Sequence, residues 1–130
     1  DDIIDRAQYT LEDRALHLIA LQAPMATDLR LISAVISVAS ELERMGDYAE
    51  GIAEIVIRGA GEPLLKPLID IPRMAQIAQR MLRDALDAFV HRDLDAARRL
   101  AGQDDEVDQL TTAIQNELLG MMVADPSNSE

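Results

Sequence analysis

Acidic side chains recur at helical spacing in the middle of the chain. Glu43, Asp47, Glu50 and Glu54 follow one another at steps of three or four residues, so a helix would place their carboxylates on one face. Like charges at this spacing destabilise an isolated helix by roughly 0.2–0.5 kcal/mol per pair. Carboxylate oxygens are ligands that hard or borderline cations prefer, so a bound metal ion could offset the repulsion. Solvent and the nearby Arg44 are the simpler alternative.

A second acidic pair, Asp1 and Asp5, lies near the start of the chain. If two antiparallel helices turn at Pro24, residues equally far from the turn lie opposite each other. Asp5 and Glu43 each lie 19 positions from Pro24, and Asp1 and Asp47 each lie 23 positions from it. Four carboxylates that converge in this way repel one another unless they are protonated, hydrated or bridged by a metal ion. Taken alone, this geometry fits a solvated acidic patch as well as it fits a metal site.

An internal repeat favours the metal interpretation. Residues 1–5 match residues 104–108 at an offset of 103 positions, and a proline follows each copy (Pro24 and Pro126). The later segment therefore looks like a second copy of the first helix. It carries the same spacing of acids at Asp104 and Asp108.

Apolar residues at steps of three and four predict the helices that position these acids. We expect a helix over residues 2–22 and, after Pro24, a second helix to about residue 58. Two more are expected over 73–90 and 94–123, with Asp93 as the N-cap of the last and Gly102 as its weakest position. Residues 59–72 form a connector rich in Gly and Pro, and 125–130 form a tail. The chain is thus predicted to be all-α, an antiparallel bundle of about four helices in two hairpins, 1–58 and 73–124.

Composition supports this fold and excludes several functions. Apolar residues make up 48 % and aromatic residues only 2 % of the chain, which suits helix packing better than a β-sandwich. The net charge of −12 argues against binding to nucleic acid or to anionic lipid. We find no apolar run long enough to insert in a membrane and no signal-peptide pattern, so we expect a cytoplasmic protein. The chain begins without Met and looks like part of a longer protein.

Three stretches together resemble the PhoU family of phosphate-uptake regulators. They are LQAPMATDLR at residues 21–30, LERMGDYA at 42–49 and AFVHRDL at 88–94. The resemblance covers nearly the whole chain and implies two repeats of a three-helix bundle. By that order this chain would hold helices two and three of the first repeat and helices one and two of the second. The outer two helices would be missing.

The resemblance also implies multinuclear iron or zinc clusters that are bound by the acidic motifs. When the ligand positions of the family are transferred to this sequence, the first site would use four carboxylates. The second would use two, because the helix that would supply its other ligands is missing. These residues are Asp1, Asp5, Glu43 and Asp47 for the first site and Asp104 and Asp108 for the second. One position departs from the family pattern, because Gly51 stands where members often have Asn.

The function implied by the resemblance is regulatory and not enzymatic. Such a protein would act in the cytoplasm as a negative regulator between the ATPase of a phosphate ABC transporter and a sensor histidine kinase. Two alternatives stay open, a carboxylate-bridged metal oxidase of the ferritin-like type and a metal-free helical interaction module. No Glu-x-x-His pattern, which such oxidases use on two helices, occurs in the sequence. We further expect the chain to form a homo-oligomer, including one with exchanged helices, because two absent helices would expose an apolar seam.

Overall fold

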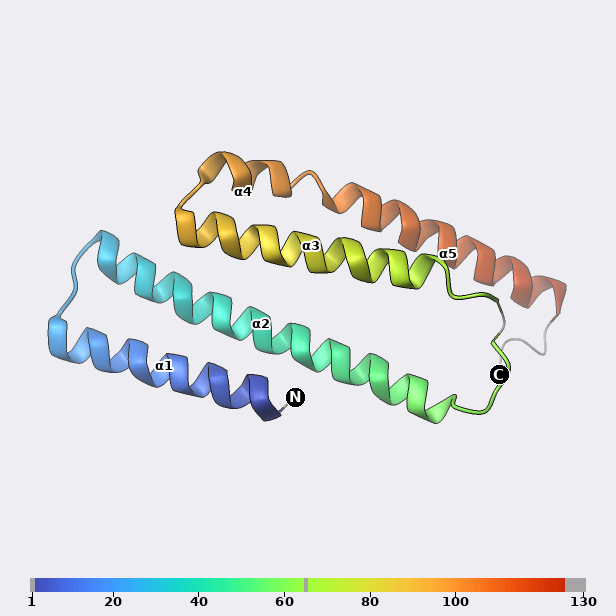
Figure 1. The fold of residues 1–130 in the computed structure, drawn as a ribbon, viewed down its shortest axis with the longest axis horizontal. Helices are drawn as coiled ribbons and strands as arrows, with labels where there is room; N and C mark the ends of the chain where they lie inside the picture. The colour runs from blue at the N-terminus through green and yellow to red at the C-terminus, as the bar shows by residue number, and fades with distance from the viewer. Residues whose placement is uncertain (1, 65, 126–130) are drawn as a thin grey trace. The chain divides into compact units, whose positions relative to one another are not determined.

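The computed structural model describes residues 2–64 and 66–125, and these form α-helices joined by short connections. The helices are α1 (Asp2–Gln22), α2 (Thr27–Arg58), α3 (Asp70–His91), α4 (Leu94–Leu100) and α5 (Asp104–Ala124). The described part of the chain contains no β-strand, so the predicted all-α class is confirmed (Figure 1). None of its helices is long and apolar enough to cross a membrane.

The chain divides into two compact units, Asp1–Glu62 and Pro63–Glu130. In the first unit α1 and α2 run antiparallel along each other (Figure 1). The turn between them contains Ala23 and Ala26, both with positive φ angles of 44° and 49°. Ala26 occupies the N-cap of α2 and makes no side-chain cap. Thr27, whose hydroxyl would suit an N-cap, is already the first helical residue.

Small residues hold the first unit together. Ala15 of α1 and Ala39 of α2 are its buried apolar residues within the described range. Alanines at a helix crossing let two backbones approach closely. The α2 helix has 32 residues and α1 has 21. About eleven residues of α2, or roughly 16 Å of helix, consequently extend past the start of α1.

The second unit contains α3, α4 and α5, with α5 antiparallel to α3 (Figure 1). Ile77 and Ala88 of α3 are its buried apolar residues among those described. The α3 helix ends at His91, and Arg92 caps it in the left-handed conformation with φ 55°. Asp93 then caps α4 as predicted, because its side chain accepts hydrogen bonds from the backbone nitrogens of Asp95 and Ala96.

Two predicted helix boundaries were wrong. The expected single helix over 94–123 is divided into α4 and α5 by a turn at 101–103. In this turn the nitrogens of Gly102 and Gln103 donate to carbonyls three residues earlier, and glycine is a poor helix former. The α3 helix also begins at Asp70, three residues earlier than expected. Pro72 does not prevent this start, because the first turn of a helix needs no backbone N–H donor.

Candidate carboxylate metal centre

The interface between α1 and α2 contains polar side chains at the level where the sequence places its acids. Gln8 on α1 donates from Nε2 to Oε1 of Glu12 at 3.0 Å and to Oγ of Ser40 on α2 at 3.4 Å. Ser40 Oγ in turn donates to the carbonyl of Ile36 at 3.2 Å. These bonds fix one register of the hairpin, because a shift of either helix would separate Gln8 from Ser40.

Glu43 is the electrostatic centre of this region. Partial burial is the largest cause that raises its pKa above the ordinary value of 4.5, followed by the negative charges of Asp47, Asp5 and Glu12. Carboxylates from both helices are therefore close enough to oppose the ionisation of Glu43. Oδ1 of Asp5 is buried and has no hydrogen-bond partner in the described part of the chain. A cation would satisfy both features, since it supplies a ligand partner and positive charge.

The structure places the predicted ligands only in part. Asp5 and Asp47 each lie within electrostatic reach of Glu43, whereas Asp1 is outside the described residues. Over residues 2–64 and 66–125, no three His, Asp or Glu side chains converge closely enough to hold a metal ion. The carboxylate chemistry fits a metal, but the described side chains do not form a complete ligand set. The first metal site thus stays a prediction.

The second predicted pair lies in the other unit. Asp104 is the first residue of α5 and belongs to its acidic first turn. Asp108 lies one turn later and lines a shallow open hollow with Asp105, Thr112 and Asn116. These residues all come from the same helix. A metal at this position would need ligands from outside the described part of α5, so this site is also untested.

Sequence reasoning missed Glu12 as a member of the acidic cluster. Its position could have been found, because Asp5, Gln8 and Glu12 follow one line along α1 at helical spacing. In the structure Gln8 orients the Glu12 carboxylate, which then adds to the negative field around Glu43.

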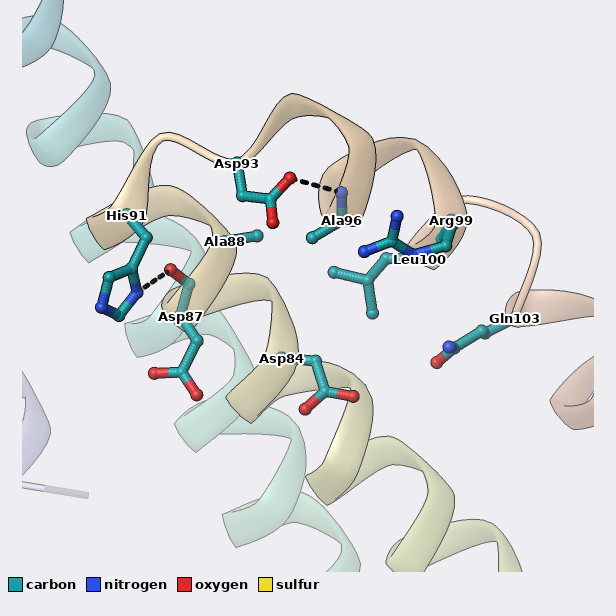
Figure 2. A pocket seen from close by; sticks show the side chains of 9 residues that line it. All are labelled: Asp84, Asp87, Ala88, His91, Asp93, Ala96, Arg99, Leu100 and Gln103. Atoms are coloured by element: carbon teal, nitrogen blue, oxygen red, sulfur yellow. Dashed lines mark hydrogen bonds between the residues drawn. The ribbon is translucent and has the colours of Figure 1, made fainter.

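Sequence reasoning also missed a cavity of about 300 Å³ in the second unit, where α3 ends and α4 begins. Figure 2 shows carboxylates of α3 on one side and Arg99 and Gln103 on the other. His91 Nδ1 lies 2.8 Å from the carbonyl oxygen of Asp87. Gln103, in the turn at 101–103 that leads from α4 into α5, completes the lining of the cavity. Gly102 was the only signal of that turn in the sequence.

Comparison with known proteins identifies the family. The model of the PhoU domain matches residues 1–56 and 71–130, which is nearly the whole chain. Three similar proteins are each described as a phosphate-specific transport system accessory protein PhoU homolog. They come from Aquifex aeolicus (41 % identical, 98 % of this chain, 58 % of that protein), Clostridium acetobutylicum (41 %, 98 % and 58 %) and Deinococcus radiodurans (37 %, 98 % and 60 %). This chain spans less than two thirds of the length of these relatives, and it belongs to the PhoU domain family.

Proposed function

We propose that this chain regulates phosphate transport and the response to phosphate starvation. The observation that carries the proposal is the PhoU match on both sides of the connector, together with relatives that are named as accessory proteins of phosphate-specific transport. In this proposal the protein is a negative regulator in the cytoplasm. It links the ATPase of a phosphate ABC transporter to a sensor histidine kinase and performs no catalysis.

A helical adaptor of this kind acts by binding. When the adaptor binds one conformation of a partner more tightly than the other, it shifts the partner toward that conformation. The size of the shift is set by the difference between its affinities for the two conformations. Exposed apolar residues suited to such contacts occur along the last turns of α2, where Tyr48, Ile52 and Val56 are each more than half exposed. Large exposed apolar patches often mark protein interaction surfaces.

The regulatory role can be tested in a bacterium that lacks its own PhoU protein. The chain would be expressed there while a phosphate-starvation promoter drives a reporter in phosphate-rich medium. We expect the reporter to be repressed again. An Ile52→Glu/Val56→Glu variant tests the α2 surface, and Glu50→Gln is the matched control on the same helix. A reporter that stays fully active while the chain accumulates at a normal level would refute the role.

We also propose that the acidic motifs bind iron or zinc in multinuclear clusters. The first cluster would use Asp1, Asp5, Glu43 and Asp47, and the second would use Asp104 and Asp108. The support is the raised pKa of Glu43 beside Asp47, Asp5 and Glu12, and the unpartnered oxygen of Asp5. When bound, the metal would supply positive charge that links the two helices of the hairpin.

Elemental analysis of protein purified without chelator tests this site. We expect iron or zinc in the wild type and its loss in a Glu43→Gln/Asp47→Asn variant. A Glu50→Gln/Glu54→Gln variant removes the same charge from the same helix and should keep the metal. Absence of metal from the wild type, or equal loss in both variants, would contradict the proposal. Catalytic turnover of ferrous iron with oxygen would instead favour the ferritin-like oxidase.

Self-association is the remaining proposal about partners. Apolar side chains that are exposed on both units would be covered in a homo-oligomer. Light scattering over a range of concentrations should give a mass above the 14.3 kDa of one chain. A mass that stays at the monomer value at high concentration would exclude it.

A further inference from the structure

Lys66 differs from the other cations of the chain. It is the only lysine, since all other basic residues are arginines. Its side chain is only 14 % exposed, whereas lysine is almost never buried without a partner. It belongs to the connector between the helices of the two units, in a region without regular secondary structure. Because it is largely buried, the ammonium group needs charged partners.

Two carboxylates from different helices hold this ammonium group. Nζ of Lys66 donates to Oδ2 of Asp70, in the first turn of α3, at 3.2 Å. It also donates to Oε2 of Glu117, 51 residues later on α5. One amine thus joins the connector, the start of α3 and the second half of α5. The hydrogen bond that Lys66 donates to Glu117 is the largest cause that raises the pKa of Lys66, so the amine stays charged at physiological pH.

The α5 helix has few other strong ties to α3. No residue of α5 is fully buried over its described length. Among the described residues, Arg73 and Glu106 form an ion pair directly between α3 and α5 at 2.9 Å, and both of these side chains are more than half exposed. Exposed pairs of this kind are screened by solvent and contribute little to stability. The partly buried Lys66 pair lies nearer the end of α5 and is the better protected of the two.

We propose that residues 66–69 form a strap that latches the second half of α5 onto α3 through Lys66, and that neutralising the Lys66 amine releases α5. Release would expose the partly buried apolar face of α5, which includes Leu110, Ile114 and Leu118. The strap is thus a conformational device of the second unit. It depends on neither the metal sites nor the phosphate role.

The single lysine allows a direct test on the whole chain. Acetylation with a limiting amount of an amine-reactive reagent, followed by peptide mass spectrometry, reports how often Lys66 leaves its partners. We expect Lys66 to react at least tenfold more slowly than a lysine in an unstructured peptide at the same pH. Labelling at the free-lysine rate would overturn the proposal.

Variants test whether the latch holds α5. Glu117→Gln removes one partner of Lys66, and Glu106→Gln is the matched control that breaks the exposed ion pair on the same helix. We expect Glu117→Gln to speed both the acetylation of Lys66 and the hydrogen exchange of amides 110–121 several-fold, with little effect from Glu106→Gln. Lys66→Gln should speed this exchange as Glu117→Gln does, and Lys66→Arg should keep it slow.

Two results would refute the strap. One is hydrogen exchange of α5 that does not change in Glu117→Gln or Lys66→Gln. The other is an equal acceleration by Glu117→Gln and the control, which would mean that any lost charge loosens α5. Circular dichroism of each variant shows whether the helices remain, and acetylation of the unmodified wild type needs no variant at all.

Discussion

Truncation of Ile77 to alanine should destabilise the second unit strongly. Ile77 is 5 % exposed and is the only large side chain among the buried residues of the described structure. The change removes three carbon atoms, worth about 2.4 kcal/mol at roughly 0.8 kcal/mol each. The cavity left behind adds to this loss, and such truncations typically cost about 2–5 kcal/mol. We therefore expect a loss of about 3 kcal/mol in the free energy of unfolding.

Ile71 provides a matched control on the same helix. It is 49 % exposed, so the same truncation removes far less buried surface and should cost about 1 kcal/mol or less. Urea denaturation followed by circular dichroism measures both losses. For a unit of this size, each kcal/mol lowers the melting temperature by roughly 4–8 °C. The melting temperature of the Ile77→Ala protein should thus be lower by roughly ten degrees or more.

Equal losses for Ile77→Ala and Ile71→Ala would refute this reasoning, because Ile71 would then be covered in solution. A loss below about 1 kcal/mol for Ile77→Ala would show that this residue does not anchor the unit.

Four other substitutions have expected outcomes. The pKa of Glu43 is raised above the ordinary value of 4.5 in the folded protein, so the folded state favours the protonated carboxyl. The stability that this carboxyl gives the fold is therefore complete below pH 4.5 and is lost as the pH rises through the raised pKa. In chelator, Glu43→Gln should therefore raise the melting temperature at neutral pH and have no effect at acid pH; no gain at neutral pH would contradict the crowding of its carboxylate. Asp93→Ala removes two hydrogen bonds at the start of α4 and should cost about 1 kcal/mol in urea denaturation. Gly61 has φ 117°, so Gly61→Ala should destabilise, whereas Gly102→Ala meets only ordinary contacts and should stabilise by about 0.4–1 kcal/mol. Thermal melts of this pair that move in the same direction would count against the assigned backbone conformations.

Local signals in the sequence predicted the first hairpin well. The predicted helix over 2–22 matches α1, and the predicted end of the second helix matches the end of α2 at Arg58. Gly59, Gly61 and nearby prolines stop helices through properties of single residues, so no tertiary contact is needed to recognise them. Asp93 was recognised for the same reason, because capping depends on one side chain and the next three residues.

The acidic cluster was predictable in outline. Counting from Pro24 placed Asp5 opposite Glu43, and in the structure the charge of Asp5 does raise the pKa of Glu43. The count could not supply Glu12, whose orientation depends on Gln8 and Ser40. Whether these carboxylates complete a metal site depends on distances of a few tenths of an ångström, which residue spacing does not determine.

By itself, the sequence determined the helical class, the connector and the lines of acids, because helical periodicity and breaking residues act over a few positions. The tertiary structure alone decided two features. It formed the cavity beside Asp84, and it joined Lys66 to Glu117. The physical reason is the same in each case: contacts between residues far apart in sequence depend on how helices pack, and periodicity carries no information about which side chains then meet.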